Sequence, residues 1–293
     1  MVKRLLPCHG RFLQLSHGAH YHYLDEGQGE PVVMLHGNPS WSFYYRHLLL
    51  ALRPSQRVIV PDHIGCGLSD KPEDNAYTYS LSQRVADLEE LLDHLGIQQK
   101  MTLVVHDWGG MIGMAYATRY PERIQKLVIL NTGAFPLPAT KPLPLALKIC
   151  RDTPVGSFLV RGFNAFSLAA SWIGCKQRPM PRALRCAYTA PYNSWRNRIA
   201  TLRFVQDIPL KQGDPAWTEV NRVADSLHRL KDKPMLILWG EKDFVFDRHF
   251  LAEWKKRFPS ARIHTWPDGG HYILEDASDE IVPLIQDFVC DQG

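Results

Sequence analysis

Short apolar segments alternate with segments of helical periodicity over the first 135 residues of the chain. Continuous apolar runs of four or five residues are typical of strands in a parallel sheet whose two faces are both covered. The predicted strands of this half are residues 31–35, 57–60, 101–105 and 126–130. Between the second and the third, residues 81–95 repeat Leu and Val at helical spacing and stop at Gly96, which predicts a crossover helix.

Two further strand-like segments precede the first of these strands. Residues 11–16 and 20–24 are separated by His17-Gly18-Ala19, and this spacing predicts a tight β-hairpin. The central sheet is therefore expected to be mostly, rather than entirely, parallel.

The pattern changes after Phe135. Four prolines interrupt the chain, and the segments that follow up to residue 228 are helical, rich in Arg and aromatic residues, and without a strand pattern. Alternation then resumes with strand 234–239, helix 249–258, strand 262–266 and helix 280–289. The simplest arrangement is a βα core formed by residues 1–135 and 229–293, interrupted by a helical cap formed by residues 136–228.

The bulk composition is that of an ordinary globular protein. A length of 293 residues suffices for one large α/β unit with an insertion, and hydrophobic and charged fractions of 45% and 22% exclude a disordered chain. No apolar run has the length of a signal-peptide core or a membrane span, so we expect a cytoplasmic protein. Six cysteines without C-x-x-C spacing or neighbouring His ladders suggest neither a disulfide framework nor a zinc site. We also expect no other metal and no cofactor.

The net charge of +4 is unevenly distributed along the chain. The cap contains 13 Lys and Arg against 5 Asp and Glu, whereas the rest of the chain contains 21 against 25. Such a basic segment predicts contact with an acidic partner enzyme or an anionic lipid surface, and a merely solvated face is the alternative. We expect no nucleic-acid partner.

The strongest candidate for catalysis is Asp107. It follows the apolar strand 101–105 and precedes Trp108-Gly109-Gly110 and a helix-like segment, which is the strand–turn–helix context of a nucleophile elbow. The usual elbow carries Ser, and here Asp replaces it. A carboxylate with a pKa of about 3.9 is already ionised at neutral pH, so it suits attack at an sp³ carbon to give an alkyl-enzyme ester. An Asp that merely caps the following helix is the structural alternative.

A second motif follows the first parallel strand. His36-Gly37-Asn38-Pro39 stands where this kind of fold donates an oxyanion-hole N–H group. The side-chain amide of Asn38 and the indole N–H of Trp108 are hydrogen-bond donors that suit a departing anion. On its own the motif is compatible with a simple turn, but an Asp elbow about seventy residues later makes it specific.

The other members of a triad are expected after the last strands. His271, in the Gly-rich loop before the final helix, is the candidate base. Asp243 is the candidate acid that orients its imidazole, and Glu241 is a weaker candidate. The residue after the earlier strand is Asn131, which cannot act as the acid.

Longer strings extend these motifs, namely HGNPSWSF at 36–43, DHIGCGLSDKP at 62–72 and LVRGFNAF at 159–166. Through them the chain resembles the haloalkane dehalogenase superfamily of α/β-hydrolases over nearly its whole length. Within that superfamily it is more similar to the branch that contains the cis-β-lactone decarboxylases of bacterial long-chain olefin biosynthesis. Ser40 stands where the family usually has Thr.

The resemblance implies an α/β-hydrolase fold with a helical cap and no cofactor. It implies that Asp107, His271 and Asp243 form the triad and that Asn38 and Trp108 form the anion-binding pair. The loop 62–72 is expected to shape the base of the pocket.

The resemblance also implies two activities that the residues do not separate. A β-lactone decarboxylase converts a cis-3-alkyl-4-alkyl-oxetan-2-one to a cis-alkene and CO₂, while the anion pair binds the departing carboxylate. A haloalkane dehalogenase displaces halide, and His271 then activates the water that cleaves the ester. The resemblance favours the lactone. The substrate is small and hydrophobic in both cases, and other enzymes of olefin biosynthesis are candidate partners for the basic cap.

Two further hypotheses stay open. An epoxide hydrolase also uses an Asp nucleophile and needs cap tyrosines, for which Tyr188 and Tyr192 are available, although core packing explains both equally well. The other hypothesis is a non-enzymatic relative that binds a ligand or a protein. A complete set of triad residues argues against it, while the basic cap is the feature that it explains better.

Overall fold

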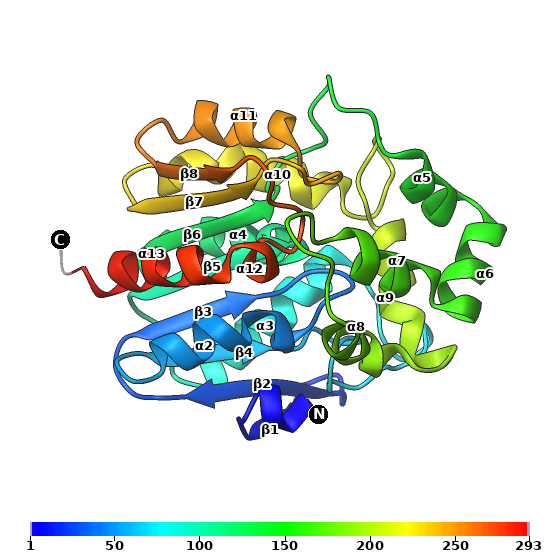
Figure 1. The fold of residues 1–293 in the computed structure, drawn as a ribbon, viewed down its shortest axis with the longest axis horizontal. Coiled ribbons are helices and arrows are strands. Elements are labelled where there is room, and N and C mark those ends of the chain that lie inside the picture. The colour runs from blue at the N-terminus through cyan, green and yellow to red at the C-terminus, as the bar shows by residue number, and fades with distance from the viewer. Residues whose placement is uncertain (1, 292–293) are drawn as a thin grey trace.

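The computed structural model describes residues 2–291. An eight-stranded sheet runs through the middle of the molecule in the order β1-β2-β4-β3-β5-β6-β7-β8 (Figure 1). Its strands are β1 (Gly10–Gln14), β2 (His20–Glu26), β3 (Pro31–Leu35), β4 (Arg57–Pro61), β5 (Met101–Asp107), β6 (Ile124–Thr132), β7 (Met235–Gly240) and β8 (Arg262–Trp266). The pairs β1–β2 and β2–β4 are antiparallel and the other neighbouring pairs are parallel. The mostly parallel sheet predicted from the sequence is therefore confirmed.

Helices cover both faces of the sheet, and strand side chains alternate between the two. Val33 and Leu35 of β3 belong to a core shared with α3 (Leu81–His94), α4 (Trp108–Arg119), α10 (Trp217–Ser226) and α11 (Arg248–Arg257). Val32 and Met34 belong to the other core, shared with α2 (Arg46–Leu52), α12 (Ile273–Asp276) and α13 (Ser278–Cys290). Within residues 2–291, no helix combines the length and the apolar character that crossing a membrane requires.

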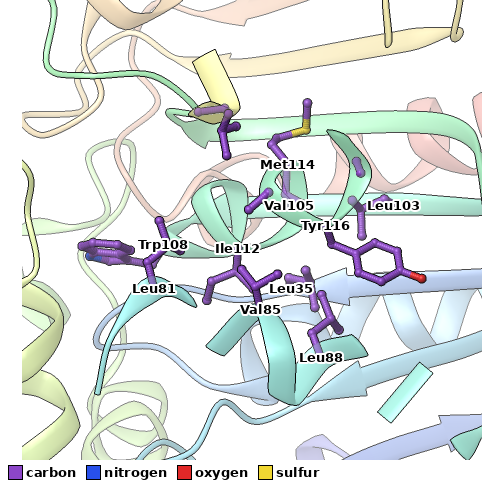
Figure 2. Close-up of a cluster of buried hydrophobic side chains, with 14 of the residues drawn as sticks. Leu35, Leu81, Val85, Leu88, Leu103, Val105, Trp108, Ile112, Met114 and Tyr116 are labelled. Carbon is purple, nitrogen blue, oxygen red and sulfur yellow. The ribbon is translucent and has the colours of Figure 1, made fainter. Parts of the chain in front are cut away.

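Helix α4 packs in the middle of the first core. Figure 2 shows its Ile112 beside Leu35 of the sheet and beside Val85 of α3. Trp108, the first residue of α4, stands at the end of this cluster. The residue before it, Asp107, is therefore held by a helix whose apolar side chains fix its position.

The cap helices lie together beyond one end of the sheet (Figure 1). They are α5 (Leu145–Asp152), α6 (Pro154–Phe163), α7 (Ala165–Ile173), α8 (Arg182–Thr189) and α9 (Ile199–Gln206), with short 3₁₀ turns η3 (Ala190–Tyr192) and η4 (Arg196–Arg198). Helix α10 also precedes residue 228, but it contacts α4 of the core. The division of the chain at residues 135 and 228 stays a prediction.

The predicted strands and the crossover helix lie within two residues of their expected ends. The hairpin strand expected at residues 11–16 is shorter, because Leu15 already forms the turn through backbone hydrogen bonds with Gly18 and Ala19.

The hydrophobic pattern of the sequence did not reveal α2 or the 3₁₀ turn η1 (Ser42–Tyr45) before it. Their side chains are buried on nearly every side, so no polar stripe marks a helix there. The remaining short elements are α1 (Val2–Leu5), η2 (Pro121–Arg123) and η5 (Leu227–Leu230).

A hydrogen bond from the cap to a buried ion pair of the core fastens the two parts together. Both terminal nitrogens of Arg46, in α2, donate to the carboxylate of Glu275, in α12, and the Nη2–Oε2 distance is 2.7 Å. Tyr188, in α8 of the cap, donates its hydroxyl to the same carboxylate. The side chains of Arg46 and Glu275 are only 3% and 7% exposed, so each charge depends on the other for compensation.

Glu275→Ala should therefore lower the free energy of unfolding by about 3–5 kcal/mol, because it leaves a buried guanidinium without its partner. Urea unfolding followed by tryptophan fluorescence measures the change. The exposed pair of Lys242 and Asp268, with side chains 56% and 70% exposed, is the control. Asp268→Ala should cost less than about 1 kcal/mol. Equal effects of the two substitutions would contradict the role of Glu275.

Candidate active site

Asp107 lies at the turn between β5 and α4. Its φ is 50° and its ψ is −127°, a positive-φ conformation that a non-glycine residue keeps only where its surroundings enforce it. A Cβ on Gly109 would lie 2.0 Å from the carbonyl oxygen of Leu35, and one on Gly110 would lie 1.8 Å from Oγ1 of Thr132. The two glycines thus allow α4 to start directly against β3 and β6.

The two carboxylate oxygens of Asp107 have different surroundings. Oδ1 accepts the backbone N–H of Asn38 at 2.6 Å, and the carboxylate also accepts the backbone N–H of Trp108. A Cβ on Gly37 would lie 2.0 Å from Oδ1, so a larger residue there would displace the carboxylate. Oδ2 instead lies 3.7 Å from Nε2 of His271. Oδ2 is therefore the oxygen that is placed to reach a substrate.

His271 and Asp243 come from the loops after β8 and β7. Nδ1 of His271 and Oδ2 of Asp243 are 2.8 Å apart. The two loops pass in close contact, since a Cβ on Gly240 would lie 2.4 Å from the carbonyl oxygen of Gly270. The structure thus brings together Asp107, His271 and Asp243, the three residues singled out from the sequence.

Asn131 holds the loop that carries Asp243. Its side-chain nitrogen donates to the carbonyl oxygen of Gly240 at 2.9 Å, and its Oδ1 accepts the N–H of Gly240 at 2.8 Å. Glu241, the weaker candidate acid, is exposed to solvent. No sequence pattern indicated that Asn131 fixes the end of β7, because the two positions are far apart in the chain.

The charges of the three residues influence one another. Burial by itself lowers the pKa of His271, but the charge of Asp243, the hydrogen bond to it and the charge of Asp107 outweigh burial and raise the pKa above 6.5. Burial raises the pKa of Asp107, against the charge of His271 and the two backbone N–H groups. Burial holds the pKa of the adjacent His106 well below its usual value. The surroundings of His271 therefore favour its protonated form, and those of His106 favour its neutral form.

An apolar cavity of about 380 Å³ lies beside Asp107. Much of its wall is apolar and comes from both the core and the cap, including Met111, Phe135, Leu147, Phe166, Val205 and Phe246. Lys141 also lines it, but its ammonium group is paired with Asp247 at 2.6 Å. Among the described residues 2–291, no group of His, Cys, Asp and Glu is arranged to hold a metal ion. Such a cavity suits a hydrophobic molecule with few polar groups.

Asn38 and Trp108 both line this cavity. The side-chain nitrogen of Asn38 donates to the carbonyl oxygen of Thr201, in α9, at 3.1 Å, which leaves its second N–H for a ligand. The ring of Trp108 packs against Phe204 of the same helix, with 5.4 Å between centroids. Cap helix α9 thus orients both candidate anion donors, a relation that the sequence pattern did not show.

Comparison with known proteins gives the fold family. Residues 30–278 match the family described as alpha/beta hydrolase fold. The chain belongs to the α/β-hydrolase family. This α/β-hydrolase is 61% identical over 289 residues to the cis-3-alkyl-4-alkyloxetan-2-one decarboxylase of Shewanella oneidensis, a match that covers 99% of this chain and 91% of the relative.

Further relatives are named either as decarboxylases or as haloalkane dehalogenases. The α/β-hydrolase is 49% identical to the cis-3-alkyl-4-alkyloxetan-2-one decarboxylase of Xanthomonas campestris pv. campestris, over 94% of each chain. It is 32% identical to haloalkane dehalogenase 2 of Mycobacterium bovis, over 96% of this chain and 95% of the relative. The solved structure of haloalkane dehalogenase DbeA from Bradyrhizobium elkani is 26% identical, with a TM-score of 0.83 and 96% of each chain covered. The resemblance inferred from the sequence is confirmed, with decarboxylases nearer than dehalogenases.

Two expectations about the pocket change with the structure. Tyr192 donates to the carbonyl oxygen of Ser40 at 2.8 Å and Tyr188 donates to Glu275, and neither lines the cavity. Core packing therefore explains both tyrosines, and neither is placed to protonate an oxirane. The expectation that the loop 62–72 shapes the base of the pocket is wrong, because none of its residues lines the cavity.

Asp243→Asn should lower the pKa of His271, because it removes the negative charge that raises this pKa. NMR titration of the imidazole resonances measures the shift, and His271→Gln identifies the resonance. Asp268→Asn, an exposed change in the same loop as His271, should leave the pKa of His271 as in the wild type. An unchanged pKa of His271 in Asp243→Asn would show that the pair does not act as its geometry indicates.

Proposed function

We propose that the protein is a β-lactone decarboxylase that converts a cis-3-alkyl-4-alkyloxetan-2-one to a cis-alkene and CO₂. The observation that carries the proposal is the buried Asp107 carboxylate, whose Oδ2 is not held by Asn38 and lies beside an apolar cavity. A carboxylate nucleophile in such a place suits attack at an alkyl carbon. The identities of 61% and 49% to decarboxylases, against 32% to a dehalogenase, favour the lactone as the electrophile.

The proposed reaction needs no water. Oδ2 of Asp107 attacks C4 of the lactone ring, and the C4–O bond breaks with its electron pair going to the new carboxylate. The N–H groups of Asn38 and Trp108 bind this anion as it forms. Loss of CO₂ then breaks the C2–C3 bond, whose electrons form the alkene, and the carboxylate of Asp107 departs from C4 in its original form.

His271 supports the departure of Asp107 electrostatically. Its Nε2 lies 3.7 Å from Oδ2 of Asp107, and Asp243 raises its pKa, which favours the imidazolium form beside the oxygen that regains negative charge. In the lactone reaction this proton does not have to move.

Haloalkane dehalogenation is the second candidate. The same Oδ2 would displace halide, and a neutral His271 would take a proton from the water that cleaves the ester. The identity of 32% to a dehalogenase and the shared fold support this candidate. The positions of Tyr188 and Tyr192 do not support an epoxide hydrolase.

The decisive assay supplies a cis-3,4-dialkyl oxetan-2-one and, separately, a 1-bromoalkane of matched chain length. Gas chromatography measures alkene, and ion chromatography measures bromide. We expect alkene from the wild type and less than roughly a hundredth of that rate from Asp107→Ala, because the nucleophile is lost. Asp268→Ala removes an exposed carboxylate and should keep the wild-type rate. Bromide release without alkene formation would transfer the assignment to a dehalogenase.

Trp108→Phe should reduce alkene formation by about 10²-fold or more, because it removes a donor to the departing carboxylate from a site that excludes water. Trace cleavage of simple carboxylic esters is the internal control, since backbone N–H groups alone would stabilise that reaction. Ester cleavage should therefore change little. An equal fall in both rates would contradict the role of Trp108 in binding the leaving anion.

The apolar cavity agrees with a small hydrophobic substrate. A cytoplasmic location accompanies the proposal as a prediction from the sequence. So does a partner among other enzymes of olefin biosynthesis.

A further inference from the structure

The cap carries exposed apolar side chains on three consecutive helices. On α6 they follow one another at three- and four-residue spacing and therefore share a side of the helix. The exposed residues are Leu145 and Ile149 on α5, Val155, Phe158, Leu159 and Phe163 on α6, and Leu168, Trp172 and Ile173 on α7. We call these nine residues the apolar face. Outside the cap, the large apolar residues of comparable exposure within the described chain are Phe12 and Leu68.

The α5 and α6 parts of this face lie on the outside of the cap. On α6, the buried residues are Gly156 and Val160. Figure 1 shows α5 and α6 at the outer edge of the cap, away from the sheet. Large apolar side chains exposed together on neighbouring helices of a globular protein indicate a site of interaction.

Basic side chains accompany the apolar face. Residues 145–198 contain nine Lys and Arg but a single acid, Asp152. Arg151 and Arg161 are paired with Asp214 and Glu73 from outside this segment. The exposed basic residues of the segment are Lys148, Lys176, Arg178, Arg182 and Arg196. The guanidinium of Arg185 lies 3.7 Å from the ring centroid of the exposed Trp172, so a cation and an aromatic ring are presented together. Apolar and aromatic side chains bordered by Lys and Arg are the combination that binds an anionic lipid surface.

The cavity of the candidate active site opens within the apolar face. Ala146, Leu159, Ala169 and Ile173 line the cavity and are also exposed to solvent. They come from α5, α6 and α7, the three helices that form the face. A molecule that enters the cavity between these helices passes over the apolar face.

We propose that the apolar face docks on an anionic lipid surface and that the substrate enters the cavity directly from the lipid. A molecule with two alkyl substituents partitions into lipid rather than water, so an entrance that rests on the membrane meets a high substrate concentration. An acidic protein on the same face would match the basic side chains but would cover the entrance. The nature of the substrate rests on the proposed function, whereas the docking depends on the surface alone.

The test is co-sedimentation of the full chain with vesicles. One set contains phosphatidylglycerol and phosphatidylcholine in equal parts, and the other contains phosphatidylcholine alone. We expect binding to the mixed vesicles and binding weaker by about tenfold or more to the neutral ones, because several basic side chains lose their counter-charge. Phe163→Gln/Trp172→Gln should weaken binding to the mixed vesicles by about tenfold, because two rings no longer enter the lipid interface.

The chain offers a matched control. Phe12→Gln/Leu68→Gln changes two equally exposed apolar residues outside the cap and should bind like the wild type. Phe163 and Trp172 do not line the cavity, so their double variant should keep the wild-type rate on a short-chain lactone dissolved in water. It should lose rate on a long-chain lactone supplied in the mixed vesicles. Failure of the proposed function would appear differently, as vesicle binding without turnover in either form.

Three results would overturn the proposal. The first is that the wild type does not bind the mixed vesicles, or that the Phe163→Gln/Trp172→Gln variant binds them equally well. The second is a wild-type dimer in sedimentation velocity that this variant converts to a monomer, which would assign the face to a second copy of the chain. The third is binding of poly-Glu that depends on Phe163 and Trp172 without vesicle binding, which would assign the face to an acidic protein.

Discussion

The backbone turn at Asp107 is the constraint on which the candidate site depends. The chain passes from β5 to α4 through a single residue of positive φ, so α4 starts directly against the neighbouring strands. Only glycine fits at positions 109 and 110 of this turn, and Gly37 must leave room for the carboxylate itself. The same turn places one carboxylate oxygen on the N–H of Asn38 and leaves the other toward His271. The strained turn thus gives the two carboxylate oxygens of Asp107 different neighbours.

The cap is part of the site as well as its cover. Helix α9 accepts a hydrogen bond from Asn38 through Thr201 and packs Phe204 against Trp108, so both candidate anion donors are oriented from the cap. On the other side, Tyr188 joins the buried pair of Arg46 and Glu275 and ties α8 to the core. Because the cavity wall includes residues of both parts, its shape depends on this attachment.

The same arrangement of charges would serve either of the two proposed electrophiles. Attack by Asp107 at an alkyl carbon is common to lactone decarboxylation and to dehalogenation, and the two reactions differ in the step after this attack. Hydrolysis of an ester requires His271 to accept a proton from water, whereas loss of CO₂ regenerates the carboxylate without water. Asp243 and Asp107 raise the pKa of His271, which favours its positively charged form beside Oδ2. Both proposed reactions use the same three residues, so the substrate would decide which reaction follows the attack.

The sequence by itself determined the order of strands and helices, the elbow at Asp107 and the loops that carry His271 and Asp243. Each of these follows from a local signal: an apolar run, a helical spacing, or a polar residue directly after a strand. Only the tertiary structure decided which oxygen of Asp107 is not bound by Asn38, and that Asn131 holds Gly240. It also decided that α9 orients Asn38 and Trp108, and that no residue of loop 62–72 lines the cavity. These relations join residues that are distant in the chain, and the periodicity of one segment carries no information about which other segment packs against it.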